Sequence, residues 1–138
     1  MDYIVKSLLI LLILLVFICP LAFAQTRSQP VPGKGLELYE QNCLSCHQAD
    51  GSGVPMLTPP LVNAEYVKGD KIKLINIVLK GLKGVEIGGT TYNTAMPAFK
   101  HLSDEDIAAV LTYVRNNFNN NGGPIMKEDV AAVRKVSN

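Results

Sequence analysis

The sequence predicts an all-α domain of about four short helices, with a short β-hairpin near residues 84–93. Apolar residues recur at helical spacing in several separate segments, which is the main signal of amphipathic helices. The run Ser-Asp-Glu-Asp at residues 103–106 is a strong helix start, because a hydroxyl cap precedes carboxylates on the first turn. A Gly-Gly pair at residues 88–89 lies between two short apolar runs, as in a tight hairpin.

The N-terminal segment has the pattern of a secretory signal peptide. Residues 8–18 are an unbroken apolar run behind Lys6, and residues 22–24 read Ala-Phe-Ala, a small-x-small pattern before a cleavage point. We therefore expect a signal peptide over residues 1–24 and an extended leader over residues 25–32. Cleavage would leave a periplasmic or otherwise exported domain with no membrane span. If the segment stays uncleaved, it could anchor the domain in the membrane, facing the periplasm.

The first half of the domain is predicted to contain two helices and a long loop. Leu36, Tyr39 and Cys43 recur at helical spacing, so we expect an amphipathic helix over residues 34–46. Residues 48–63 are rich in Gly and Pro and predict a structured loop. Asp70 is expected to cap a helix over residues 71–80, whose apolar face would be formed by Ile72, Ile75, Val78 and Leu79.

The second half is predicted to contain the hairpin and two further helices. The helix that begins after Ser103 would bury Ile107, Val110, Leu111 and Val114. A last short helix over residues 127–135 has Val130 and Val133 as its apolar side and is expected to pack on the outside or to fray. The predicted organisation is thus a domain over residues 33–120 and a C-terminal extension over residues 121–138.

Length and charge exclude some function classes. The chain has 138 residues and a formal net charge of +1, so no basic surface points to nucleic acid. A single domain of this length has a small core, and burial of something large would stabilise it. The cysteines that would remain after cleavage are Cys43 and Cys46, so no disulfide framework is expected.

The most informative motif is Cys43-Leu44-Ser45-Cys46-His47, because C-x-x-C-H is the attachment signature of a c-type haem. Two thiols at this spacing can bond to one porphyrin, and the neighbouring imidazole then lies beside the iron as a ligand. A reactive dithiol or half of a zinc site are the alternatives. A dithiol normally sits at a helix N-terminus, whereas this pair follows a helical stretch, and zinc would lack two further ligands. The motif therefore predicts one covalent haem c, with its iron bound by His47.

The second axial ligand of the iron has four candidates, Met56, Met96, Met126 and His101. Met56 is too close in sequence to His47, and Met126 lies in the tail. Met96 is late in a loop between two helices, and Pro97 stiffens the chain behind it. We therefore expect Met96 to bind the iron, with His101 as the leading substitute and a core methionine as the alternative role. A thioether ligand raises the reduction potential and closes the iron to small molecules, which favours electron transfer.

Together these residues resemble the class I bacterial cytochrome c family over residues 33–120, with a likeness to cytochrome domains attached to periplasmic dehydrogenases and reductases. The motifs that carry the resemblance are Gly35-x-x-x-Tyr39, C-x-x-C-H, Asp50-Gly51-x-Gly53, Pro59-Pro60-Leu61, Met96-Pro97-Ala98-Phe99 and residues 102–107. The resemblance implies a small cytochrome c fold of about four helices around one haem, with attachment outside the bacterial inner membrane.

The resemblance also implies roles for individual residues. The carbonyl of Pro60, or of Pro59, would accept a hydrogen bond from His47, and Leu61 would pack beside the haem. Gly35 and Tyr39 would pack against Val110 and Tyr113. Because the chain has no tryptophan, contacts to the haem propionates would have to come from Tyr66, Tyr92, Asn93 or water.

The predicted function is that of an exported electron carrier rather than an enzyme. It would pass one electron at a time between larger redox proteins, such as a dehydrogenase, a reductase or a terminal oxidase, through an iron bound by His47 and Met96. One alternative is an electron-transfer subunit of a periplasmic dehydrogenase or oxidase complex. Another is a haem enzyme or gas sensor in which the sixth position of the iron is open.

Overall fold

The computed structural model describes residues 3–7 and 33–137. Most of the predicted signal peptide and the leader thus lie outside the described residues, and residues 3–7 form one short helix. The domain is mostly helical with a two-stranded antiparallel sheet, which confirms the predicted fold class. Its elements are α2 (Lys34–Asn42), α3 (Leu44–His47), α4 (Glu65–Lys68), α5 (Lys71–Lys80), β1 (Val85–Ile87), β2 (Thr90–Tyr92), α6 (Asp104–Asn116) and α7 (Lys127–Ser137).

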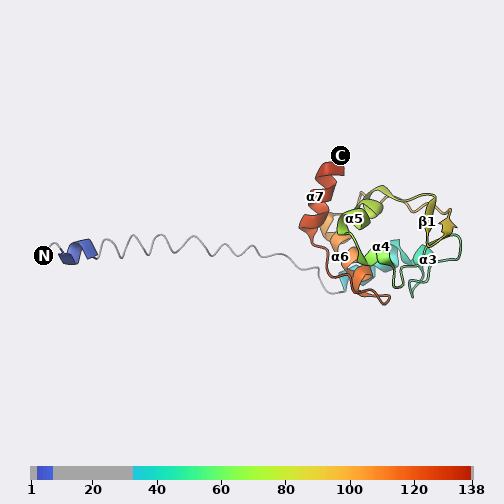
Figure 1. The fold of residues 1–138 in the computed structure, drawn as a ribbon, viewed down its shortest axis with the longest axis horizontal. Coiled ribbons are helices and arrows are strands. Elements are labelled where there is room, and N and C mark those ends of the chain that lie inside the picture. Colours follow the sequence, from blue (N-terminus) through green and yellow to red (C-terminus); the bar gives the residue numbers. More distant parts are fainter. Residues whose placement is uncertain (1–2, 8–32, 138) are drawn as a thin grey trace.

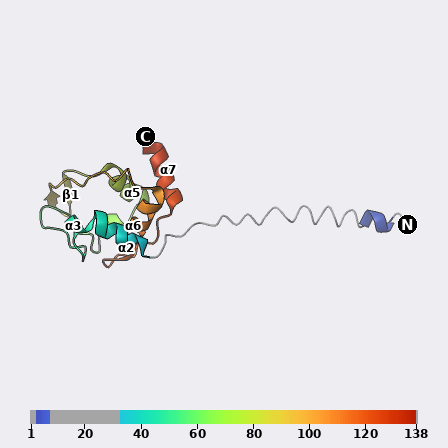
Figure 2. The same cartoon turned by 180° about the vertical axis from the view of Figure 1, so that it is seen from behind.

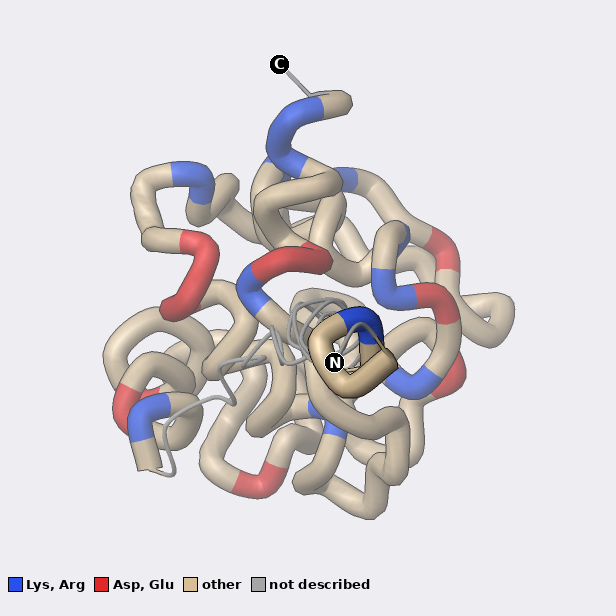
Figure 3. Tube along the Cα trace, turned by 90° about the vertical axis from the view of Figure 1, so that its left-hand side faces the viewer, with Lys and Arg blue, Asp and Glu red and all other residues tan. Residues whose placement is uncertain are grey.

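The arrangement places α3 and the hairpin at one end of the domain and α7 at the other, as the two opposite views show (Figures 1 and 2). Charged residues of both signs are interspersed on the side seen in Figure 3. Within residues 3–7 and 33–137, no helix combines the length and apolarity that crossing a bilayer would need.

The first predicted helix is divided in two by Cys43. Residues 34–46 were expected to be continuous, but α2 ends at Asn42 and α3 begins at Leu44, since Cys43 has φ −121°. The predicted buried face was also wrong at one position: Leu36 is 42% exposed, whereas Gly35, Leu38 and Tyr39 are buried. Spacing alone could not choose the phase, because the contact residue on this face is a glycine.

Gly35 is the point of closest approach between α2 and α6. A Cβ at this position would lie 2.5 Å from the carbonyl oxygen of Ala109 and 2.7 Å from the Cβ of Tyr113. Tyr39 is buried on the same side, and its ring centroid lies 5.5 Å from that of Tyr113. The expected pairing of α2 with Tyr113 is thus confirmed, and Ala109 is a further neighbour of Gly35.

Gly35→Ala is expected to destabilise the protein by about 1–3 kcal/mol, because the added methyl group overpacks this crossing. In a helix without such a neighbour the same change would stabilise the protein by about 1 kcal/mol. The sign of the change in the free energy of unfolding therefore shows whether the two helices are in close contact here. Thermal or denaturant unfolding measures the effect. Leu36→Ala, on the exposed side of the same helix, is the control and should change the free energy of unfolding far less. A stabilised Gly35→Ala variant would contradict the close approach.

α5 begins and ends where the sequence predicts. The Asp70 carboxylate accepts hydrogen bonds from the backbone N–H groups of Ile72 and Lys73, at 2.8 and 3.3 Å. Ile72 was expected on the buried face but is 62% exposed, and Leu74 takes its place in the core. The one-turn helix α4 was not predicted at all.

The hairpin is confirmed with three residues in each strand and Val85 opposite Tyr92. Gly88 and Gly89 both have positive φ, at 57° and 77°, which is why two glycines stand in this turn.

The C-terminal helix is part of the core. Val130 is fully buried and Val133 nearly so. Of the two expected outcomes, packing on the outside or fraying, the helix therefore packs. The segment before it is fixed by Thr112, whose hydroxyl donates to the carbonyl of Ile125 and accepts from the same residue's N–H. Arg134 donates from α7 to the carboxylate of Asp104 at 2.8 Å. α7 therefore covers α5 and α6.

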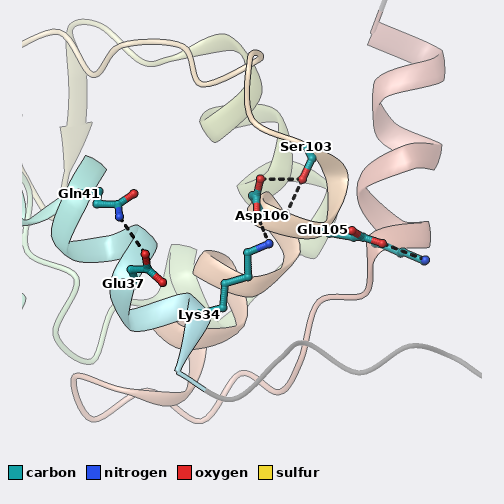
Figure 4. A network of polar contacts seen from close by, with 7 residues as sticks. Lys34, Glu37, Gln41, Ser103, Glu105 and Asp106 are labelled. Atoms are coloured by element: carbon teal, nitrogen blue, oxygen red, sulfur yellow. Dashed lines mark hydrogen bonds and ion pairs between the residues drawn. The ribbon is translucent and has the colours of Figure 1, made fainter.

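A polar contact joins the start of α2 to the start of α6 (Figure 4). The Lys34 ammonium lies 2.5 Å from a carboxylate oxygen of Asp106, and the Ser103 hydroxyl donates to the other oxygen at 2.7 Å. The Ser103 oxygen accepts from the backbone N–H of Asp106, which confirms the predicted cap. Hydrogen bonds from Lys34 and then from Ser103 hold the pKa of Asp106 below its ordinary value.

This contact predicts a contribution to acid stability. A carboxyl whose pKa is lower in the folded chain stabilises the fold above its unfolded pKa and loses that effect as the pH falls through the folded value. Asp106→Asn should therefore lose stability at neutral pH and show a shallower decline between about pH 5 and pH 2. Denaturant titrations at several pH values measure this slope. Glu86→Gln in the hairpin is the control, and an unchanged slope for Asp106→Asn would refute the contribution.

Candidate haem site

An apolar cavity lies inside the helical layer and offers about 80 Å³ to the centres of water-sized spheres. A second cavity, of about 140 Å³ by the same measure, adjoins it, and the two share wall residues that include Cys43, His47 and Met96. The wall of the first cavity is formed by α2, α4, α5, α6 and the loops at the hairpin end, with Leu38, Tyr66, Val67, Leu74, Val78, Val110 and Val114 among its residues.

His47 is held by the proline loop. Its Nδ1 lies 3.2 Å from the carbonyl oxygen of Pro59, so the N–H at Nδ1 donates and Nε2 keeps its lone pair. Burial lowers the pKa of the His47 imidazole, which favours the neutral form that binds metals. Of the two carbonyls expected to accept this hydrogen bond, that of Pro59 does so, whereas the Pro60 carbonyl accepts from the Tyr66 hydroxyl.

A glycine lets the loop fold back to reach this histidine. Gly53 has φ +67°, and a Cβ there would clash with the carbonyl of Thr58 and lie 2.8 Å from that of Pro59. The Gly53 N–H also donates to the His47 carbonyl at 3.1 Å. The Gly-rich segment therefore positions the acceptor that orients His47.

The two cysteines lie at the edge of the cavities. Cys43 is half-buried and lines both, while Cys46 is exposed and lines the second. Burial, and to a lesser degree the nearby Cys46, raises the pKa of the Cys43 thiol to about 11. A redox dithiol needs the opposite shift.

A zinc site finds no support either. Over the described ranges, 3–7 and 33–137, the His, Cys, Asp and Glu side chains nowhere form a group of three that could hold a metal ion.

Met96 lines both cavities from the loop that follows the hairpin. Its backbone N–H and carbonyl pair with the carbonyl and N–H of Leu82, at 2.8 and 3.1 Å. The close approach is permitted by Gly81, where φ is +76° and a Cβ would lie 2.5 Å from the Met96 oxygen. The paired hydrogen bonds with Leu82 thus fix the backbone of Met96, which places its side chain at the cavity wall.

The other candidate ligands lie away from these cavities. Met56 is 69% exposed, Met126 is buried near α7, and His101 is exposed on the surface with its ring 6.1 Å from that of Phe99. None of the three lines either cavity.

The residues present fit a covalently attached haem. The wall of the first cavity is almost wholly apolar, as a porphyrin face requires. The free thiol of Cys43 lies at its edge and that of Cys46 at the edge of the second cavity, and His47 and Met96 offer a nitrogen and a sulfur donor to both. Leu61 is buried in the same wall.

Sequence reasoning missed several wall residues, among them Leu38, Leu82 and Phe99. Leu38 lies one turn before Asn42 on the buried face of α2, and it would have been found had the phase of that helix been assigned correctly. Leu82 and Phe99 lie outside regular elements, so no periodicity marks them. Tyr66, an expected propionate partner, also lines the cavity, although its hydroxyl is engaged by Pro60.

Comparison with known proteins agrees with this site. The family model described as cytochrome c matches residues 33–118. Cytochrome c-552 of Thermus thermophilus is 42% identical over 85 residues, covering 58% of this chain and 64% of that protein.

Longer relatives match over a smaller part of their own length. The cytochrome c subunit of a quinone alcohol dehydrogenase from Gluconobacter oxydans is 36% identical over 103 residues, which are 72% of this chain and 22% of that subunit. A cbb3-type oxidase subunit, CcoP, of Azospirillum brasilense is 36% identical over 90 residues, which cover 60% of this chain and 27% of that subunit. The chain thus spans less than two thirds of each of these relatives.

The family match covers more than half of the chain, and it includes the C-x-x-C-H motif and the loop that bears Met96. The chain therefore belongs to the cytochrome c family, whose members carry covalently attached haem c with iron.

Proposed function

We propose that this chain is an exported single-haem electron carrier in which His47 and Met96 bind the iron from separate parts of the fold. The observation that carries the proposal is that both side chains line the same apolar cavity, although 49 positions separate them (96 − 47). When bound, the haem supplies an iron that alternates between the ferrous and ferric states.

In this proposal the residues of the site hold and orient the haem and take no part in proton transfer or bond making with a substrate. Cys43 and Cys46 form the thioether links, and Leu61 packs against the haem beside His47. The Pro59 carbonyl orients the imidazole and makes it a stronger donor to iron. Two strong axial ligands limit rearrangement when the oxidation state changes. No side chain is assigned as an acid, a base or a nucleophile, so the chain is proposed to act as a carrier rather than an enzyme.

The partners in this proposal are larger redox proteins, an electron donor and an electron acceptor. The cavity edge near Cys46 is exposed and is the proposed contact. A second candidate function is that of a fixed subunit of a dehydrogenase or oxidase complex, which the matches to cytochrome subunits of such enzymes favour. Copurification with a dehydrogenase would support the second; isolation as a free protein would support the first.

The absorption spectrum of the purified holoprotein tests the ligand set. The ferric form should show the near-infrared charge-transfer band of sulfur bound to iron, and the ferrous form should not bind carbon monoxide quickly. Absence of the band together with rapid carbon monoxide binding would instead identify an open sixth position, as in a haem enzyme or gas sensor.

A further inference from the structure

Arg115 is a buried cation on α6, with 2% of its surface exposed. Its guanidinium donates to backbone carbonyls on two segments. On the α4 side, Nη1 reaches Val67 at 2.5 Å and Gly69 at 3.1 Å, and Nη2 reaches Lys68 at 3.0 Å. On the other side, Nε donates to Gly122 and Gly123, and Nη2 donates to Gly122. The side chain therefore joins the end of α4 to the segment before α7.

The partners of this guanidinium are neutral. No carboxylate in the described part of the chain forms an ion pair with it, and desolvation is the cause that lowers its pKa. A guanidinium stays protonated at neutral pH even when its pKa falls. Arg115 thus carries a full positive charge that only carbonyl dipoles balance.

This charge lies directly behind the wall of the haem cavity. Val67, whose carbonyl accepts from Nη1, contributes to that wall, as does Val114, the residue before Arg115. The guanidinium is thus hydrogen-bonded to the backbone of one wall residue and lies on a helix, α6, that contributes others. Buried charges interact more strongly than exposed ones, because little water screens them.

A direct contact with the haem propionates is not available to this side chain. A guanidinium has five N–H groups, and the contacts of Nε, Nη1 and Nη2 with carbonyls engage all of them. Any effect on the iron must therefore act through the charge and not through a hydrogen bond.

We propose that Arg115 raises the reduction potential of the haem iron by placing behind the cavity wall a positive charge with which no carboxylate of the described residues pairs. The inference rests on the proposed function only in that haem occupies this cavity. Ferric iron carries one more positive charge than ferrous iron, so a fixed cation nearby disfavours the ferric state. Arg115 would thus bias the carrier toward its reduced form, in addition to the effect of the Met96 ligand.

Potentiometric titration of the holoprotein tests this charge effect. Arg115→Gln removes the charge and keeps a donor, and it should lower the potential by about 59 mV, which corresponds to a tenfold shift in the ferrous-to-ferric ratio. Arg115→Lys keeps the charge and loses donors. It should therefore unfold at a lower temperature than the wild type, while its ferrous-to-ferric ratio changes less than twofold. Arg134→Gln removes an arginine that pairs with Asp104, and its potential should likewise stay near that of the wild type.

A second pair of variants leaves Arg115 in place. The carbonyl of Gly123 accepts from Nε, its φ is +70°, and the space around its Cα is open. Aspartate and asparagine tolerate this backbone region better than most residues. Gly123→Asp should lower the potential relative to Gly123→Asn, because the added carboxylate offsets the guanidinium charge.

The outcomes separate this inference from the proposed function. Equal potentials for Gly123→Asp and Gly123→Asn, or equal losses for Arg115→Gln and Arg115→Lys, would overturn the charge effect and leave Arg115 a purely structural residue. A wild-type protein without the sulfur-to-iron band would instead refute the proposed ligand set. The first failure is therefore seen in the reduction potentials of the variants and the second in the absorption spectrum of the wild type.

Discussion

Replacing Cys43 and Cys46 together by serine is expected to abolish covalent haem attachment completely. Serine hydroxyls do not form the thioether links, so the haem would dissociate when the protein is denatured. The variant should also fold poorly, since the apolar cavity would lose the group that fills it. Denaturing electrophoresis with haem staining measures the attachment.

Ser45→Ala is the matched control for this change. Ser45 lies between the two cysteines and is exposed, so its variant should keep full haem staining. Retention of haem by the double serine variant under denaturing conditions would show that attachment occurs elsewhere.

Met96→Ala is expected to lower the reduction potential by about 100 mV or more, within the range of about 0.8 V that axial ligands cover. Loss of the thioether removes the ligand that favours ferrous iron and opens the sixth position. The near-infrared band of the ferric protein should disappear, and the ferrous protein should bind carbon monoxide. Optical titration and carbon monoxide binding measure the two effects.

Met56→Ala is the control, because Met56 is an exposed methionine that lines neither cavity. It should keep the wild-type band and potential. If Met96→Ala keeps the band, another residue binds the iron, and His101→Ala would then be the next variant to compare.

The elements predicted best from the sequence are those whose ends are set by local chemistry. Asp70 and Ser103 cap their helices through their own side chains, and Gly88-Gly89 supplies the positive φ of the hairpin turn. Each of these signals acts within a few residues. Their strength does not depend on what the element packs against.

The predictions from sequence were wrong where contacts with residues far along the chain determine the local structure. α4 is a single turn whose C-terminal carbonyls are held by Arg115, 46 to 48 positions away. The exposure of Ile72 and the burial of Leu74 follow from how α5 packs in the assembled domain, which spacing cannot specify. Periodicity identifies an apolar helix more reliably than it identifies the buried face.

The candidate site shows the same division. Cys43, Cys46 and His47 form one short motif whose chemistry can be read directly, and Met96 was selected by excluding the other methionines. The choice between Pro59 and Pro60 could not be made in this way, because adjacent carbonyls differ only in the direction that the folded loop gives them. In the fold, the Tyr66 hydroxyl donates to the Pro60 carbonyl and His47 donates to the Pro59 carbonyl.

Mass spectrometry of the intact protein isolated from its native host tests the central claim most directly. The account predicts a mass equal to the polypeptide plus one haem, with the added mass located by fragmentation on the segment from Cys43 to His47. The same spectrum reports whether residues 1–24 are removed. A polypeptide without added haem, in which the thiols of Cys43 and Cys46 both react with an alkylating agent, would contradict the account.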